Sequence, residues 1–176
     1  ESLEYLGLYD YTKDINHLPA GLIGLSLIAS ETSIYTLPET LSILAIDTSL
    51  THVICKYPKN LNTLVINNEQ DNCADVVFPD NHNIMTCVVV GNNDAIIPKK
   101  ISKLIYKPGD FEGAPHLPDL SSYDTLNYLE CTLNVMNEFD MNTLPKSIKT
   151  IHLNCGTFMQ DTNENFHKTS SACDKD

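Results

Sequence analysis

The sequence predicts a mainly β solenoid: about eight coils of about 20 residues each, with a parallel sheet along one face and little helix. Two observations support this fold class. Apolar-proline pairs recur about every 20 residues, with a longer interval before the last, and an L-x-x-L-x-L pattern follows, as in LPETLSILAI and YPKNLNTLVI. A repeat of this length is typical of stacked coils rather than of a domain built around one cleft. The pairs are Leu18-Pro19, Leu37-Pro38, Tyr57-Pro58, Phe78-Pro79, Ile97-Pro98, Leu117-Pro118 and Leu144-Pro145.

Each unit is expected to supply one short strand to the sheet. The last two apolar residues of the pattern are two positions apart, so their side chains share one face of a strand, and the first lies on the approach to it. Stacking unit on unit then gives parallel strands over a common core. The inward triplets are Leu3/Leu6/Leu8, Leu22/Leu25/Leu27, Leu41/Leu44/Ile46, Leu61/Leu64/Ile66, Ile84/Cys87/Val89, Ile101/Leu104/Tyr106, Leu126/Leu129/Cys131 and Ile148/Ile151/Leu153.

The proline ahead of each strand favours an extended return path. It fixes φ, cannot donate to a ladder, and pushes the preceding residue to an extended conformation. We expect that preceding apolar residue to pack inward as a second core column. Units of this length leave no room for a helix, so extended or short 3₁₀ returns are expected.

Two units depart from the regular spacing. Two extra residues lie between Pro79 and Ile84, and about five lie between Pro118 and Leu126. The stretch 107–118, KPGDFEGAPHLP, contains further prolines and glycines and is expected to be a loop. These insertions fall in connections, so the sheet should persist through them. The predicted domains are a repeat solenoid over 1–158 and a polar C-terminal cap or tail over 159–176.

The charge balance excludes two classes of partner. The formal net charge is -12, and the 11 basic residues are all lysine. Phosphate recognition favours clustered Lys and Arg, so nucleic acid is excluded, and anionic membrane surfaces are disfavoured in the same way. No apolar run approaches the length of a membrane-spanning helix, so no membrane span is expected.

The start of the sequence predicts an uncovered end of the stack. The chain begins at Glu1 without methionine, and Leu3 already belongs to a triplet, so no polar cap precedes the first coil. Solenoids need caps to remain soluble. We expect either preceding sequence, in a processed or longer protein, or a covering partner.

Cysteine, histidine and motif patterns predict no catalytic residue, no cofactor and no metal site. Six cysteines occur without C-x-x-C spacing, and two of them, Cys87 and Cys131, fall on inward positions as small buried thiols. The six histidines are scattered, and no nucleophile-elbow, zinc-protease or nucleotide-binding motif occurs. The cysteine usage favours a reducing compartment, so a cytoplasmic protein is expected, with a virion as the alternative.

The repeat resembles short-class leucine-rich repeats, and most closely FNIP repeats, which occur in social amoebae and some giant viruses. Short repeats of bacterial effectors match almost as well through YPKNLNTLVINNE. The resemblance covers roughly residues 1–158 and implies a leucine-rich-repeat-like fold that serves as a protein-interaction surface in a viral or protist protein. The unit closest to the FNIP pattern is LPKSIKTIHLNCGTF, with matches at Pro145, Ser147, Ile148, Ile151, Leu153, Gly156 and Phe158.

The outward strand residues form the candidate partner-binding surface. A solvated sheet face should be mostly polar, yet apolar residues occupy its centre, and charged and aromatic residues follow towards the C-terminal end. Two alternatives remain: β-branched residues favour strands on their own account, or the tail or an absent segment covers them. The apolar candidates are Ile28, Ile43, Val65, Val88, Val90 and Ile105, and the rim candidates are Lys103, Lys107, Tyr128, Glu130 and His152.

These observations predict a non-enzymatic module that binds a protein partner through its strand face. The alternative is a structural component of a larger assembly, such as a viral particle, whose neighbouring subunits bury the open end and the apolar face. A third class is a secreted, disulfide-bonded ligand, which predicts the loss of free thiols.

Overall fold

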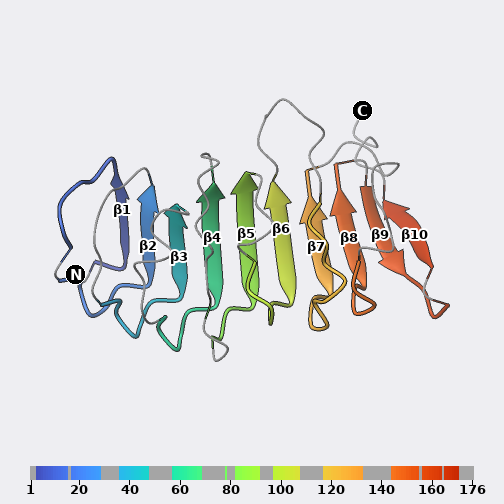
Figure 1. Cartoon of the computed structure of the whole chain (residues 1–176), viewed down its shortest axis with the longest axis horizontal. Coiled ribbons are helices and arrows are strands. Elements are labelled where there is room, and N and C mark those ends of the chain that lie inside the picture. The colour runs from blue at the N-terminus through green and yellow to red at the C-terminus, as the bar shows by residue number, and fades with distance from the viewer. Residues whose placement is uncertain are drawn as a thin grey trace.

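Strands and turns build the described part of the chain, which contains no helix. In the computed structural model the described residues are 3–15, 17–28, 36–47, 57–68, 78, 82–91, 97–107, 117–132, 144–154, 156–163 and 165–170. Accordingly, no helix able to cross a membrane occurs among them. One sheet holds the strands in sequence order (Figure 1): β1 (Tyr5–Tyr9), β2 (Gly24–Ile28), β3 (Ile43–Asp47), β4 (Thr63–Asn68), β5 (Thr86–Gly91), β6 (Lys103–Lys107), β7 (Tyr128–Cys131), β8 (Thr150–Leu153), β9 (Gly156–Gln160) and β10 (Phe166–Ser170).

Strands β1 to β8 are parallel, each to the next, which confirms the predicted solenoid. Their register aligns the repeat units on one another. Leu25 pairs with Leu6 on one side and with Leu44 on the other, and Leu64 continues the same row on β4. The L-x-x-L-x-L pattern therefore sets the register, because a slip of one residue would turn every apolar side chain to the solvent.

The number of regular coils is smaller than predicted. The strands from β1 to β6 follow one another at intervals of about 20 residues, which makes about five regular coils. The strand β7 then starts after the longest interval, at Tyr128, and β8 follows at Thr150. The prediction of eight coils is wrong because the inward triplets count strands, whereas a regular coil also needs a return of constant length. The insertion after Pro118 lengthens the return ahead of β7, and β9 then reverses direction.

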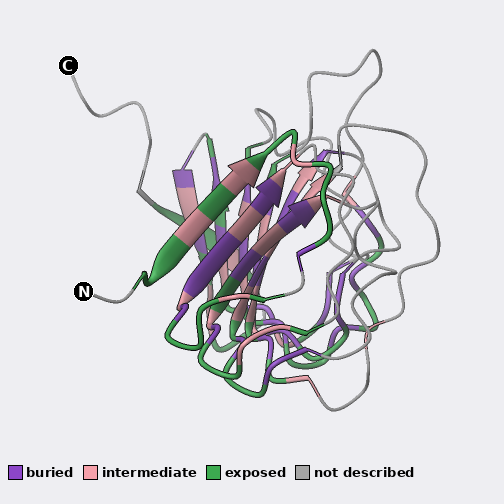
Figure 2. Ribbon diagram, turned by 90° about the vertical axis from the view of Figure 1, so that its left-hand side faces the viewer, coloured by how far each residue is buried: buried purple, intermediate pink, exposed green. Residues whose placement is uncertain are grey.

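The core lies directly behind the sheet and repeats from coil to coil. The triplet residues from Leu22 to Leu153 are buried, and Tyr106 is the largest fully buried side chain. The first triplet is the exception, because no coil covers its outer side among the described residues: Leu3 is 49% exposed, and Leu6 and Leu8 are only partly buried. Figure 2 shows the strands on one side of the molecule and the turns of the returns on the other.

The apolar residues ahead of the prolines form the predicted second core column. Tyr57, Ile97 and Leu144 are buried. The others are partly buried and pack against the core: Leu18, Leu37, Phe78 and Leu117. The rings of Tyr57 and Phe78 lie 5.7 Å apart between their centroids, so consecutive coils also contact each other through this column.

In four units a tight turn joins the proline to the first apolar residue of the triplet. The amide of Leu41 donates a hydrogen bond to the carbonyl of Pro38 at 3.1 Å, and Leu22, Leu61 and Ile148 form the same turn. The polar residue inside the turn then donates its side-chain hydrogen bond to a carbonyl of the preceding coil. These inter-coil bonds come from Thr40, Asn60, Asn83, Thr125 and Ser147. They satisfy backbone carbonyls that the parallel sheet does not reach.

Tyr123 occupies the place of the proline in the unit with the long insertion. The amide of Leu126 donates to the carbonyl of Tyr123 at 3.2 Å, as Leu22, Leu41, Leu61 and Ile148 donate to the carbonyls of their prolines. The Tyr123 ring is buried, its hydroxyl donates to the carbonyl of Ile97 at 3.1 Å, and Lys99 Nζ lies 4.3 Å from the ring centroid. The extra residues after Pro118 therefore leave the turn geometry unchanged.

An antiparallel hairpin, β9–β10, follows the parallel stack. Gly156, at the start of β9, has φ 142°, a conformation that strongly favours glycine. The buried ring of Phe158 closes the core at this end. The hairpin spans the predicted boundary between 158 and 159, and β10 gives regular structure to part of the segment predicted as a cap or tail.

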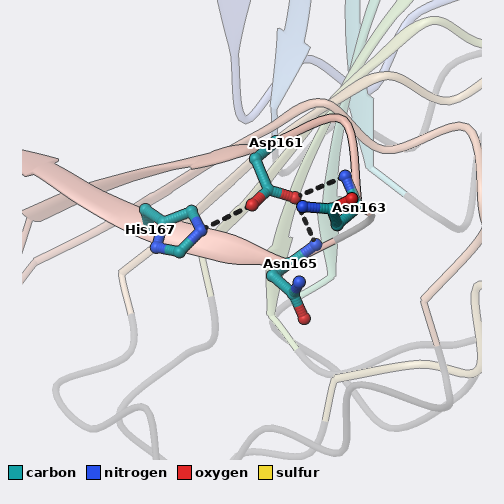
Figure 3. Close-up of polar contacts among 4 residues, drawn as sticks. All are labelled: Asp161, Asn163, Asn165 and His167. Atoms are coloured by element: carbon teal, nitrogen blue, oxygen red, sulfur yellow. Dashed lines mark hydrogen bonds and ion pairs between the residues drawn. The ribbon is translucent and has the colours of Figure 1, made fainter.

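Asp161 organises the turn between β9 and β10 (Figure 3). Its Oδ1 accepts hydrogen bonds from the amides of Asn163 and Asn165 at 2.8 and 2.9 Å, and its Oδ2 lies 2.8 Å from His167 Nε2. The Asn165 amide, followed by the contact with His167, holds the pKa of the Asp161 carboxyl below its usual value of 3.8.

We expect the hairpin turn to open in acid. Because the folded pKa of Asp161 is lowered, its contribution is present above the ordinary aspartate range and is lost as the pH falls through the folded value. Amide exchange at Asn163 and Asn165, followed by NMR from pH 6 down to about pH 2, measures the effect. Asp161→Asn should abolish this pH dependence, and unchanged protection in acid would contradict the assigned role.

Two cysteines are described, and both are free thiols. Cys87 and Cys131 are buried at inward positions, as predicted. Burial raises the pKa of the Cys87 thiol to about 12, so this thiol stays protonated and packs as a small apolar side chain. The other cysteines, Cys55, Cys73, Cys155 and Cys173, lie outside the described residues.

Candidate binding surface

The outward side chains of the sheet form rows that run across the strands. In the middle row the side chains are small at the N-terminal end, apolar at the centre and polar at the C-terminal end. Register places these residues next to one another in order: Gly7, Ser26, Ala45, Val65, Val88, Ile105, Glu130, His152 and Thr157. Three of the apolar candidates and two of the rim candidates therefore lie in one line.

The apolar row, defined as Val65, Val88 and Ile105, lies on three neighbouring hydrogen-bonded strands, β4 to β6. All three side chains are half-buried although they face away from the core. Because neighbouring strands are about 4.8 Å apart, the Val88 side chain lies beside that of Val65 on one strand and that of Ile105 on the other, and the three present one continuous apolar strip.

The remaining apolar candidates lie in other rows. Val90 pairs with Lys107 beyond the C-terminal side of the apolar row. Ile43 is 38% exposed and lies two residues before Ala45 on β3, in the neighbouring row that pairs with Thr63, and Ile28 is the last residue of β2. The structure thus brings together Val65, Val88 and Ile105, with Val90 beside them, and leaves Ile28 and Ile43 apart.

The polar cluster, defined as Lys103, Tyr128, Glu130 and His152, adjoins the apolar row on β6 to β8. Lys103 Nζ lies 4.5 Å from the centroid of the Tyr128 ring, and the Tyr128 hydroxyl donates to Glu130 Oε2 at 3.3 Å. Partial burial, followed by the charge of Glu130 and this hydrogen bond, raises the pKa of the Tyr128 phenol. The phenol therefore remains a hydrogen-bond donor at neutral pH.

His152 connects the polar cluster to the hairpin. It pairs in register with Glu130, and its Nδ1 lies 2.7 Å from Thr157 Oγ1 on β9. Thr157 and the half-exposed Met159 extend the outward face by one strand. The sequence reasoning omitted both because β9 carries no apolar-proline signal. Its only local signal is Gly156, which the repeat alignment assigned to the end of a coil.

The chemistry of the surface is that of a contact face with a hydrophobic centre. It offers an apolar strip, a cation held over an aromatic ring, and a phenol, a carboxylate and an imidazole at one end. Among the residues that the structure describes, no three metal-binding side chains group together.

No protein-family model matches this chain, and searches of curated proteins and of solved structures found no similar protein.

Proposed function

We propose that the chain is a non-enzymatic interaction module that binds a protein partner through the strand face of its solenoid. The observation that supports this function best is the apolar row beside the polar cluster. Three β-branched side chains are aligned by register on β4 to β6, and charged and aromatic groups border them on one side. An apolar centre with a polar border is the usual composition of a protein interface.

The repeat pattern supports the same proposal. We infer that the solenoid is a short leucine-rich repeat of the FNIP kind, of viral or protist origin, because the inter-coil hydrogen bonds give its Ser position a physical purpose. Ser147 donates to the carbonyls of Tyr123 and Leu126 at 3.1 and 2.6 Å, and Thr40 makes the equivalent bonds to two carbonyls of its preceding coil. Repeats with this architecture present extended surfaces to partners.

Replacing the centre of the apolar row tests the function. Val65→Lys with Val88→Lys should abolish binding of the native partner, because both side chains leave the core and two cations would break the strip. The measurement is recovery of partners from the native source on the immobilised chain, followed by the affinity of any purified partner. Met85→Lys is the matched control, since Met85 is 51% exposed and precedes β5 outside the strand face.

The results of these variants decide whether the strand face binds the partner, and whether a loss of binding comes from lost apolar surface or from added charge. Loss of binding in the lysine pair, with the Met85 variant and the melting temperature unchanged, supports the strand face. Retained binding in the lysine pair contradicts it. Val65→Thr with Val88→Thr keeps the β-branched shape and removes apolar surface, so a graded loss in this pair assigns the effect to the strip rather than to the added charge.

A role within a larger assembly is the second candidate, in the cytoplasm or in a virion. The open N-terminal edge of the sheet favours it, because β1 lies at the end of the strand order with exposed large side chains at Tyr5 and Tyr9. The mass of the chain in solution distinguishes the two candidates.

A further inference from the structure

The N-terminal end of the solenoid exposes its core. Leu6 and Leu8 of β1 point inward but are only partly buried, whereas their register partners Leu25 and Leu27 are 2% and 0% exposed. In Figure 2 β1 is the front strand, exposed or intermediate along its whole length, and the strands behind it are buried at inward positions. One further strand beside β1 would complete the burial of this coil.

Among the residues that the structure describes, no strand pairs with the outer edge of β1. The carbonyl of Glu4 accepts from the amide of Gly24 at 3.0 Å, and the amide of Asp10 donates to the carbonyl of Ile28 at 3.2 Å. The even-numbered residues therefore direct their backbone groups towards β2. Since backbone groups alternate along a strand, those of the odd-numbered residues face the open edge. These are Tyr5, Gly7 and Tyr9.

The sequence of β1 is a palindrome, Tyr-Leu-Gly-Leu-Tyr, centred on Gly7. A two-fold interface needs a patch that is complementary to itself. Antiparallel pairing of two β1 strands about Gly7 places Leu6 beside Leu8 of the second copy and Tyr5 beside Tyr9 of the second copy. A Cβ built on Gly7 meets no atom within 4 Å, so the centre of the patch is uncovered.

The opposite edge of the sheet is protected against pairing. Lys168 of β10 pairs with Phe158, which is buried, so the lysine lies on the inward side of the edge strand. A register irregularity follows between Lys168 and Ser170. Inward charges and irregular strands are the usual devices that prevent edge pairing, and β1 has neither.

We propose that two copies of this chain associate by antiparallel pairing of β1 with β1, on a two-fold axis through Gly7. The inward leucines of each copy complete the core of the other, and the odd-numbered backbone groups form the new ladder. Because the axis is perpendicular to the sheet, both strand faces end on the same side of the dimer. The dimer then presents two apolar rows to a partner, which raises avidity for a repeated ligand.

Sedimentation velocity over a concentration series tests the association. The chain of 19.6 kDa should shift to twice that mass between about 1 µM and about 1 mM, the range of a small interface. Gly7→Pro removes the central donor of the open edge and no hydrogen bond to β2. It should stay monomeric throughout with an unchanged circular dichroism spectrum. A wild-type chain that is monomeric at every concentration would overturn the proposal, as would a proline variant that dimerises normally.

A proline substitution on β10, at the other edge of the sheet, tests for the alternative arrangement, in which β1 of one copy pairs head to tail with β10 of the next. The amide of Asp161 donates to the carbonyl of Asn165, so the amide of Lys168 faces away from β9. Lys168→Pro should leave the dimer intact. If the wild type instead forms longer oligomers, and Lys168→Pro stops them, then β1 pairs with β10 head to tail and the proposal is wrong.

The direction in which added salt changes the strength of association provides an independent test of the two-fold arrangement. In the two-fold arrangement Glu4 lies opposite Asp10 of the second copy, so two like charges meet at each end of the pair. Added salt should then strengthen association several-fold. Association that weakens as salt is added would contradict this arrangement.

A cysteine at the axis provides a test that does not depend on the fold of the proline variant. Residues opposite each other at a hydrogen-bonded antiparallel position have Cα atoms about 5.5 Å apart, within the span of a disulfide. Gly7→Cys should give a covalent dimer on mild oxidation, whereas Asp14→Cys, placed outside β1, should not. Absence of this cross-link at concentrations where the wild type is dimeric would contradict the two-fold axis.

Discussion

Leu64→Ala should lower the free energy of unfolding by roughly 2–5 kcal/mol, the usual cost of truncating a large aliphatic side chain in a packed core. Leu64 is 0% exposed and lies at the centre of the stack, between Leu44 on β3 and Cys87 on β5. Its removal leaves a cavity bordered by two coils that cannot close without shifting the sheet register. Urea denaturation followed by circular dichroism measures the change.

The neighbouring residue provides the matched control. Val65 is one position further along β4, faces outward and is half-buried. Val65→Ala should therefore cost less than about 1.5 kcal/mol, because less apolar area is lost and no cavity forms. Equal destabilisation by the two variants would show that the inward and outward assignments of β4 are wrong.

Tyr123→Ala should destabilise the fold by roughly 3–5 kcal/mol, as expected for the loss of a buried aromatic side chain. The ring fills the position that proline occupies in the other units and is contacted by Lys99 Nζ. Its hydroxyl also bonds the carbonyl of Ile97 in the preceding coil. The substitution removes the packing, the cation–π contact and the hydrogen bond together.

Tyr123→Phe separates these contributions. It keeps the ring and leaves the carbonyl of Ile97 without this donor, so it should cost about 1–3 kcal/mol. Thermal unfolding of both variants and the wild type measures the difference. If the phenylalanine variant is as unstable as the alanine variant, the hydrogen bond rather than the ring holds the inserted unit in register.

Periodicity within a few residues is sufficient to predict the eight parallel strands, β1 to β8. Alternation around Leu44 and Ile46, or Leu104 and Tyr106, fixes which side chains face inward, and the buried positions agree with it. The same local information predicted that Tyr57 would pack behind the sheet. It did not predict β9 and β10, because a hairpin whose outer face carries Met159 has no repeat signal and is stabilised by pairing with β8.

The candidate surface was predictable as a list of outward residues but not as an arrangement. Val65, Val88 and Ile105 belong to three different units of the repeat, and only the closure of two unequal coils places them in one row. Ile28 and Ile43 meet the same sequence criterion, yet they lie in other rows. The contact between His152 and Thr157 depends on the reversal of the chain after β8.

The sequence by itself determined the solenoid, its inward faces and the positions of its insertions, because each is encoded by spacing within one unit. Tertiary structure alone decided which coils have regular length, that Tyr123 replaces a proline, and which side chains become neighbours across strands. The physical reason is that the neighbours of a side chain across strands depend on the path of the segment that connects one strand to the next. Inserted residues lengthen these connecting segments and leave the strands unchanged. The palindrome of β1 was present in the sequence throughout, but only its position at an open edge gives it a partner.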